Sequence, residues 1–177
     1  MKILVIGSCR NNDFESKNRN YADLVTQLGF ELASRKHSIM TGGAGGLQGI
    51  LVGCYKKCEG PEWTAFYAKD EEKNPNAHPL SGIKPDQEEF SGMPYPVRNA
   101  YYTGLCDGVI ALAGRSRTLG EIISASLGYS KKVFQLKMGN NMEVLGKLSD
   151  LERIYISSKA ECGLDFLEGK RGLWLAH

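Results

Sequence analysis

The sequence predicts an α/β protein with a Rossmann-like, doubly wound and mostly parallel sheet in a single domain. Short apolar runs with the length of strands alternate with longer stretches of helical periodicity, and this alternation is typical of βαβ units. Glycine-rich or small-residue turns follow several of the apolar runs. The 177 residues, of which 42% are hydrophobic, are enough for one core, and no apolar window reaches the length of a membrane span.

The first half of the chain shows this alternation clearly. Residues 2–6 are an almost continuous apolar run and predict a buried strand. A helix is expected at 19–35, because apolar side chains recur there at helical spacing, at Tyr21, Leu24, Val25, Leu28, Leu32 and Ala33. Residues 38–41 predict a short strand that ends in a glycine-rich loop, residues 46–57 a helix, and residues 63–67 a third strand.

The second half begins with a segment of a different kind. Residues 68–93 are charged, rich in turn formers and without periodicity, so we predict a loop insertion, either a lid over a ligand or a disordered surface segment. Two prolines, Pro94 and Pro96, favour the start of a helix at 94–106. The remaining expectations are strands at 108–112, 132–136 and 154–156 and helices at 118–129 and 140–153.

Charge and cysteine content narrow the functional classes. A net charge of +2, from 22 basic and 20 acidic residues, provides no basic footprint for DNA or RNA. The chain opens directly on a strand without the layout of a signal peptide, which favours a cytoplasmic location. The cysteines are odd in number and lack CxxC pairing, so we expect reduced thiols and no metal site: Cys9, Cys54, Cys58, Cys106 and Cys162.

A candidate binding site lies at the carboxyl ends of the predicted strands, where parallel sheets of this kind bind ligands. The loops at 7–12, 42–46 and 113–117 should converge there. Between Arg98 and Glu121 the chain predicts a helix, a buried strand, a tight turn and a second helix that opens at Thr118. A helix N-terminus favours phosphate, an arginine binds phosphate or carboxylate, and Glu121 would place an acid beside the anion.

The same stretch resembles the LOG family, the cytokinin riboside 5′-monophosphate phosphoribohydrolases, also known as lysine decarboxylase-like proteins. The family signature is an arginine in a helix, then a strand, then PGGxGTxxE. Without gaps, Arg98 falls on the arginine, Ala113-Gly114-Arg115 on PGG, Thr118 on the threonine and Glu121 on the glutamate. Residues 41–49 resemble the family's YGGGxxGLMG, and Val5-Ile6-Gly7-Ser8 resembles a family strand that ends in a Gly-Ser turn.

The resemblance covers about residues 1–135 and implies hydrolysis of the N-glycosidic bond of a nucleoside 5′-monophosphate, giving free base and ribose 5-phosphate. It implies a small-molecule nucleotide as partner, no cofactor, no metal, and a homodimer. The charge balance and the lack of an apolar span disfavour nucleic acid and membrane as partners. Arg98 and Glu121 would be catalytic. The residues implied in binding of substrate and phosphate are Ser8, Gly42, Gly43, Gly114, Arg115, Arg117 and Thr118.

Several positions depart from the family pattern. Arg115 and Arg117 replace glycines, Ala113 replaces the proline, and Asn99 stands where the family usually has lysine. The two arginines either rebuild the anion site with side chains or are solvated surface charges. A second hypothesis is therefore a protein that binds or carries a nucleotide or a nucleotide-like cofactor, such as the molybdenum cofactor, without turnover. An NAD enzyme is disfavoured, because Gln48 stands where the dinucleotide fingerprint needs its third glycine.

Single residues also have simpler interpretations at this stage. Glu121 could be an acid that only complements the helix dipole, and Thr118 could only cap its helix. Ser8 could be an ordinary turn residue, and the glycines at 42–46 could form a tight turn without a ligand. The spacing from Arg98 to Glu121 favours the functional interpretation of that pair.

Overall fold

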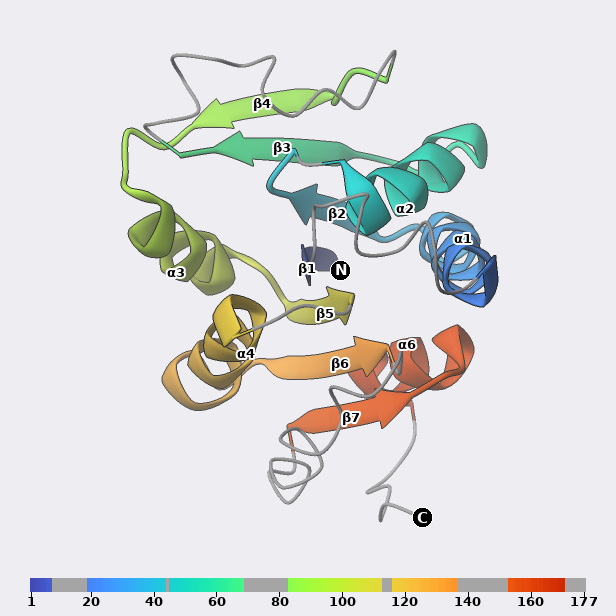
Figure 1. Ribbon diagram of the computed structural model, residues 1–177. Helices are drawn as coiled ribbons and strands as arrows, with labels where there is room; N and C mark the ends of the chain where they lie inside the picture. Colours follow the sequence, from blue (N-terminus) through green and yellow to red (C-terminus); the bar gives the residue numbers. More distant parts are fainter. Residues whose placement is uncertain (8–18, 44, 69–82, 113–115, 137–152, 171–177) are drawn as a thin grey trace.

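A parallel sheet forms the centre of the molecule (Figure 1). The computed structural model describes residues 1–7, 19–43, 45–68, 83–112, 116–136 and 153–170. Within them the strands pair in the order β4-β3-β2-β1-β5-β6-β7, and every pairing is parallel. The strand bounds are β1 Lys2–Gly7, β2 Ser38–Thr41, β3 Trp63–Tyr67, β4 Gln87–Phe90, β5 Gly108–Leu112, β6 Lys132–Leu136 and β7 Ile154–Ser157. This confirms the predicted Rossmann-like fold class.

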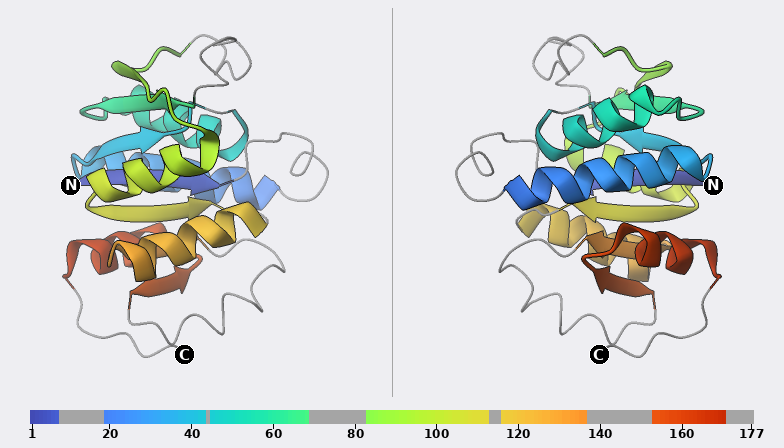
Figure 2. Two further views of the ribbon diagram at one scale, coloured as in Figure 1. Left: turned by 90° about the vertical axis from the view of Figure 1, so that its left-hand side faces the viewer. Right: turned by 90° about the vertical axis from the view of Figure 1, so that its right-hand side faces the viewer.

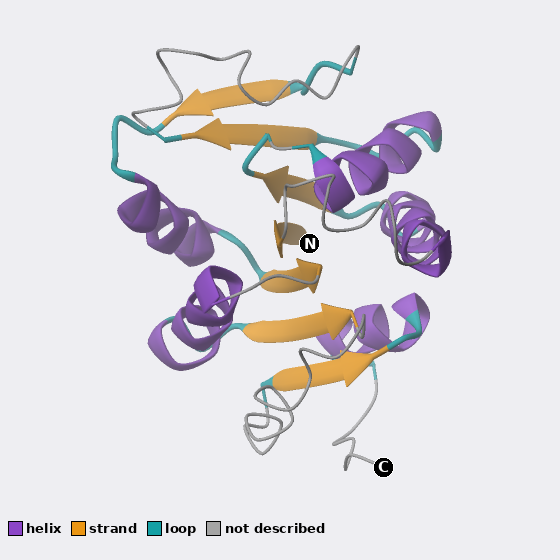
Figure 3. Ribbon diagram, viewed as in Figure 1, coloured by secondary structure: helices purple, strands orange, loops and turns teal. Residues whose placement is uncertain are grey.

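Helices cover both faces of the sheet, which makes it doubly wound (Figures 2 and 3). One face carries α1 (Arg19–Ser34), α2 (Gly46–Lys57) and α6 (Ala160–Glu168), and α1 contacts both of the others. The opposite face carries α3 (Tyr95–Leu105) and α4 (Ser116–Ile123), which continues into a short π-helix, η3 (Ser124–Gly128). The sheet is thus buried on both sides, as its continuous apolar strands predict.

Each face of the sheet has its own apolar core, because successive strand side chains point to opposite sides. Ile3 and Val5 of β1 pack with α1, α2 and α6, whereas Leu4 and Ile6 pack with α3 and α4. Five-residue strands such as β3 and β5 are buried along their whole length. The register pairs Gly7 at the end of β1 with Leu112 at the end of β5, so both strands end at one level.

The structure differs from the sequence expectations in three places. Residues 87–90, inside the predicted loop insertion, form the edge strand β4; its largely exposed Gln-Glu-Glu-Phe sequence lacks the apolar signal of a strand. The helix expected to begin at Thr118 begins at Ser116, and its last turn is a π-helix. Helix α6 was not predicted. The helix expected at 140–153 lies almost wholly outside the described residues, as does the greater part of the possible lid.

None of the helices that the structure describes is long and apolar enough to cross a membrane.

Candidate functional site

The candidate site lies at the carboxyl edge of the sheet, around the end of β1. The chain leaves β1 toward β2 on one side, and β5 pairs with β1 on the other, so this is the point where the strand order reverses. Open α/β sheets bind ligands in the crevice at such a point. Gly7 ends β1 with φ +144°, and a Cβ built there would lie 2.0 Å from the Leu112 carbonyl oxygen. Only glycine therefore allows the two strand ends to approach this closely.

The glycine-rich loop after β2 is held by two aromatic residues of β3. Thr41 is buried at the end of β2, and its Oγ1 accepts hydrogen bonds from the Gly43 backbone N–H at 3.1 Å and from the Trp63 Nε1–H at 3.0 Å. Gly43 has φ +68°, and a Cβ there would lie 2.6 Å from the Tyr67 ring. The loop conformation thus requires glycine at residue 43, for both its backbone and its lack of a side chain.

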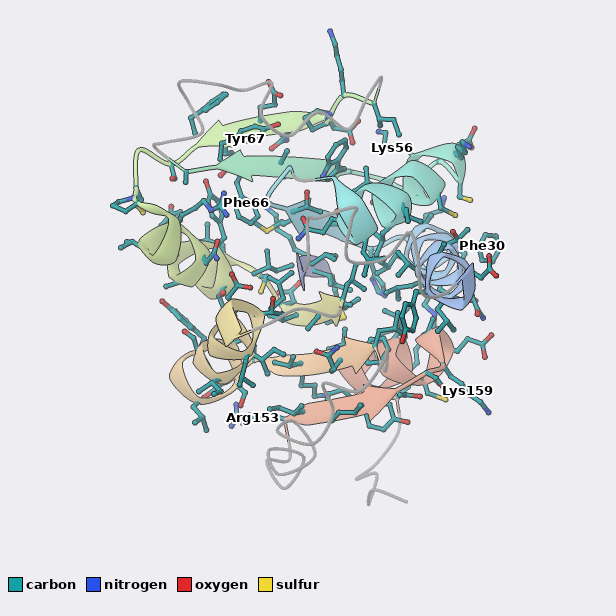
Figure 4. The ribbon with its side chains drawn as sticks, viewed as in Figure 1. Phe30, Lys56, Phe66, Tyr67, Arg153 and Lys159 are labelled. Carbon is teal, nitrogen blue, oxygen red and sulfur yellow. The ribbon has the colours of Figure 1, made fainter. Side chains whose placement is uncertain are left out.

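Arg98 reaches this loop from α3, on the opposite face of the sheet. Its side chain is 2% exposed, and its guanidinium carbon lies 5.1 Å from the centre of the Phe66 ring. Figure 4 shows Phe66 on the sheet face that α3 covers. Nη1 donates to the Phe66 carbonyl oxygen at 3.2 Å, and a Cβ on Gly42 would lie 3.5 Å from Nη2. Arg98 therefore joins α3, the end of β3 and the glycine loop.

Asn99 connects the two residues that the sequence predicts to be catalytic. Its Oδ1 accepts a hydrogen bond from Arg98 Nε at 3.1 Å, and its Nδ2 donates to Glu121 Oε1. A neutral amide can do both at once, because it carries a donor and an acceptor on the same planar group. The pair Arg98 and Glu121 is therefore linked through a side chain between them.

Glu121 and Thr118 occupy α4 differently from the sequence expectation. Because α4 begins at Ser116, Thr118 lies inside the first turn rather than at the cap, and it is buried. The first turn contains no acidic residue, and Glu121 lies in the next turn. The interpretation of Glu121 as an acid that only complements the helix dipole is thus weakened, since that effect fades beyond the first turn. Its side chain is partly exposed and directed to Asn99.

The remaining predicted residues of the site lie outside the described part of the chain. These are Ser8, Gly114 and Arg115. Arg117 belongs to α4, but its side chain is not described. Of the predicted residues, the structure brings Gly42, Gly43, Arg98, Thr118 and Glu121 to the carboxyl edge of the sheet. Among the described residues, no group of three or more His, Cys, Asp or Glu side chains is placed to hold a metal ion.

The described groups can act on an anionic or sugar-like ligand. The partly exposed Glu121 carboxylate is held by the Asn99 amide, which also binds Arg98, and Arg98 in turn lies against the glycine-rich loop at Gly42. The sequence comparisons bear on the same residues. A model of the SLOG cluster4 family matches residues 1–162, which include the glycine loop, Arg98 and Glu121. The chain belongs to the SLOG cluster4 family. This confirms the LOG-like resemblance found in the sequence.

Solved structures with the same fold as this SLOG cluster4 protein cover nearly its whole length. TM1055, a structural genomics target, is 17% identical, covers 95% of this chain and 98% of its own, and superposes with a TM-score of 0.77. The molybdenum cofactor binding protein of Rippkaea orientalis is 23% identical, with 96% of both chains covered and a TM-score of 0.73. The Moco carrier protein of Chlamydomonas reinhardtii is 17% identical, with 96% and 98% covered and a TM-score of 0.73. No curated protein sequence matches the chain significantly.

Sequence reasoning about this SLOG cluster4 chain missed two features of the site. Asn99 stands out in the sequence only as a departure from the family's lysine, although an amide next to Arg98 is the group that can reach both the arginine and an acid. The second is a pair of stacked aromatic rings next to Arg98. The centres of the Phe66 and Tyr102 rings lie 4.0 Å apart. Burial, with a hydrogen bond to Glu89, raises the pKa of Tyr102, so this ring stays neutral. Neither contact has a signal in local sequence, since each joins distant segments.

Proposed function

We propose that this SLOG cluster4 protein hydrolyses the N-glycosidic bond of a nucleoside 5′-monophosphate, releasing free base and ribose 5-phosphate. The observation that carries the proposal is the chain of hydrogen bonds from Arg98 through Asn99 to Glu121. It holds a partly exposed carboxylate at the carboxyl edge of the sheet, where ligands of such folds bind. A helix-terminal acid with only a dipole role would not need a dedicated amide partner on another helix.

Hydrolysis of an N-glycosidic bond needs few groups besides a carboxylate placed near C1′. As the bond between C1′ and the base nitrogen breaks, positive charge develops on the sugar. The hydroxyl of a water molecule then adds at C1′, and the remaining proton of that water passes to the base nitrogen by way of Glu121, so the base leaves neutral. The Glu121 carboxylate would stabilise the oxocarbenium-like sugar and orient the water, as carboxylates do in glycosidases. Arg98 is almost fully buried, so its main contribution would be to fix the position of Asn99 and the glycine loop.

The phosphate would bind at the loop that leads into α4. The backbone around Gly114, the Thr118 hydroxyl and the guanidinium groups of Arg115 and Arg117 are the candidate ligands, because backbone N–H groups at a helix N-terminus and arginine forks both favour phosphate. Gly42 and Gly43 would let the ribose approach the loop after β2, and Ser8 would approach it from the end of β1. These roles follow from the resemblance and from position in the fold.

Chromatography of purified protein incubated with a panel of nucleoside 5′-monophosphates tests the proposal. We expect free base from at least one of them and loss of that activity in Glu121→Gln, by about 100-fold or more, as is usual when an acid–base group is removed. Glu161→Gln is the matched control, because Glu161 is an exposed glutamate in the first turn of α6. Turnover that survives Glu121→Gln would refute the role of the carboxylate.

A second candidate function is the binding or carriage of a nucleotide-like cofactor without turnover. It is favoured by the fold shared with the molybdenum cofactor binding protein of Rippkaea orientalis and the Moco carrier protein of Chlamydomonas reinhardtii. The burial of Arg98 also suits a structural role better than a role in catalysis. Thermal stabilisation by a nucleotide or by the isolated cofactor, with no base released across the panel, would establish this alternative.

We also propose that two copies of the chain associate through α3. Val97, Tyr101 and Leu105 follow one another at intervals of four residues on this helix, and each is about half exposed. The Tyr129 ring at the end of η3 lies against Gly104 and extends the apolar surface. Light scattering should give twice the mass of the chain, and Tyr101→Asp should halve it. A single-chain mass for the unmodified protein would refute the proposal.

A further inference from the structure

One buried amide at the carboxyl edge has a polar atom without a partner among the described residues. Gln48 lies in the first turn of α2, directly after the glycine loop, and its side chain is 5% exposed. Its Nε2 donates to the Gly7 carbonyl oxygen at 3.5 Å. Its Oε1 has no hydrogen-bond partner within the part of the chain that the structure describes. A buried acceptor without a donor is costly, so its retention calls for an explanation.

The orientation of this amide is set by its neighbour. The Gly7 carbonyl can only accept a hydrogen bond, so the NH₂ of Gln48 faces it and Oε1 is turned away. An exchange of the two atoms would place two oxygens against each other. Gly7 is the last residue of β1 and pairs with Leu112, the last residue of β5. The unpaired oxygen thus lies at the point where the strand order reverses, which is where ligands of such sheets bind.

The glycine loop that leads to Gln48 has open space at Gly45. Gly45 precedes α2 and provides no side-chain cap, and a Cβ built on it would meet none of the described atoms within 4 Å. Gly43 and Gly46 on either side have positive φ, at +68° and +63°. A side chain such as serine or aspartate at residue 45 would fill this space and cap the helix. Glycine instead leaves this space open, three residues before Gln48 in the chain.

From these observations we infer that Gln48 is a ligand-binding residue whose Oε1 accepts a hydrogen bond from a sugar hydroxyl of the bound nucleotide. The inference rests on the proposed function only in taking a nucleoside 5′-monophosphate as the ligand. Phosphate oxygens are acceptors and would repel Oε1, whereas a hydroxyl can donate to it. Leu112, next to Gly7, leads directly into the loop proposed to hold the phosphate. The sugar is the part of the ligand joined to that phosphate, so it is the part that reaches Gln48.

Such a contact would let the protein discriminate sugars. A site built to hydrogen-bond a hydroxyl rejects the analogue that lacks it, because the buried acceptor is then left unpaired. The protein should therefore prefer ribose to a deoxyribose that lacks the hydroxyl facing Gln48. The preference should vanish when the acceptor is removed.

Binding of base-free sugars tests the inference without depending on hydrolysis. Titration calorimetry is carried out with ribose 5-phosphate and its 2-deoxy and 3-deoxy forms, on the unmodified protein and on Gln48→Met. We expect one deoxy sugar to bind the unmodified protein about tenfold more weakly or worse, and Gln48→Met to bind all three with similar, weak affinity. No binding of ribose 5-phosphate, no discrimination, or discrimination that persists in Gln48→Met would overturn the inference.

A second measurement examines the unpaired oxygen itself in the absence of ligand. Gln135 is the matched control: it is 3% exposed, and its Nε2 donates to the Leu136 carbonyl oxygen at 2.9 Å. Gln48→Met should change the melting temperature little, because loss of the long 3.5 Å hydrogen bond to Gly7 is offset by removal of the unsatisfied oxygen, while Gln135→Met should lower it by about 2–4 °C. An equal fall in both variants would show that Gln48 is satisfied in the free protein and would overturn the inference.

These results separate the inference from the proposed function. A protein that releases no base but discriminates the sugars through Gln48 would contradict hydrolysis and support the inference. A protein that releases base but shows no dependence on Gln48 would do the reverse.

Discussion

At the amino edge of the sheet, the Glu168 carboxylate accepts hydrogen bonds from several neighbours, whereas at the carboxyl edge the Gln48 oxygen has no partner among the described residues. Glu168, at the end of α6, contacts Arg35 at 3.2 Å, His37 at 2.7 Å and Lys170 at 2.5 Å. Arg35 also donates to Asp165 at 2.9 Å. The amino edge thus ties α6 to the segment between α1 and β2.

This difference sets a stabilised edge of the sheet against the edge proposed to bind a ligand. Paired charges and hydrogen-bonded polar atoms stabilise the amino edge, where no ligand site is proposed. Glycines with positive φ and an amide oxygen without a described partner cost stability at the carboxyl edge, and such costs are commonly tolerated where a ligand binds. Four variants or conditions test the comparison, taken from the largest expected effect to the smallest.

Gly7→Ala should have the largest effect, because the new Cβ would lie 2.0 Å from the Leu112 carbonyl oxygen at a backbone φ of +144°. Overpacking and backbone strain together should lower the free energy of unfolding by about 3 kcal/mol or more. Urea denaturation measures it. Gly45→Ala is the control, since its Cβ meets no described atom within 4 Å, and it should change stability little. Equal stability of the two variants would contradict the close approach of β1 and β5.

Asn99→Asp should reduce turnover by about 10- to 100-fold while leaving the free energy of unfolding nearly unchanged. Aspartate can still accept from Arg98 Nε, but it cannot donate to Glu121 and places a second negative charge beside it. Asn99→Leu removes both contacts and should be at least as inactive. Steady-state kinetics with the substrate found in the panel measures both, and full activity of Asn99→Asp would show that the amide does not position the carboxylate.

Glu168→Gln should destabilise the protein by about 2 kcal/mol without affecting ligand binding, because it removes the charge that Arg35, His37 and Lys170 share. Glu161→Gln, on the same helix but exposed, should cost no more than about 0.5 kcal/mol. Chemical denaturation of both variants, with ribose 5-phosphate titrations in parallel, tests this. A binding defect in Glu168→Gln would show that the two edges are not independent.

As the pH falls, the protein should lose stability in two steps, one for His37 and one for Glu168. Each step should cost less stability than the loss of all the ion pairs at the amino edge. Burial lowers the pKa of His37 below its ordinary 6.5, so the unfolded state binds its proton first and stability begins to fall below about that pH. Hydrogen bonds from Lys170, His37 and Arg35 outweigh burial and lower the pKa of Glu168 from 4.5 to about 2. Its contribution is therefore complete above pH 4.5 and is lost as the pH falls toward 2.

Melting temperatures across this range, compared with those of Glu168→Gln, measure the second step. The variant has no carboxylate at this position, so its curve should be flatter between pH 4.5 and 2. Parallel curves for the two proteins would show that the carboxylate does not carry the low-pH dependence.

Much of the fold was predictable because its signals are local. The buried strands β2, β3, β5 and β6 were predicted with their observed bounds, since an apolar run between turn residues shows both where a strand begins and where it ends. The edge strand β4 was missed because an exposed strand needs no apolar pattern, and it exists only through its pairing with β3. Helix α6 was missed although its buried residues, Ala160, Gly163, Leu164 and Leu167, recur at helical spacing.

The candidate site shows the same division. The spacing from Arg98 to Glu121 and the glycines at 42 and 43 are enough to predict that these residues share one edge of the sheet. The sequence did not predict that Arg98 would be buried, that Asn99 would hold Glu121, or that Glu121 would lie beyond the first turn of α4. Each of these depends on where one helix begins or on how two helices approach across the sheet.

The sequence by itself determined the fold class and the family, and it predicts the edge of the sheet for a ligand site, because periodicity and motif spacing are properties of neighbouring residues. The tertiary structure alone decided which polar groups meet. It brought Asn99 of α3 to Glu121 of α4, paired Glu168 with Arg35 and His37, and left the Gln48 oxygen beside Gly7 without a described partner. Hydrogen bonds between distant segments depend on distances of a few tenths of an ångström, which only the packed sheet and helices define.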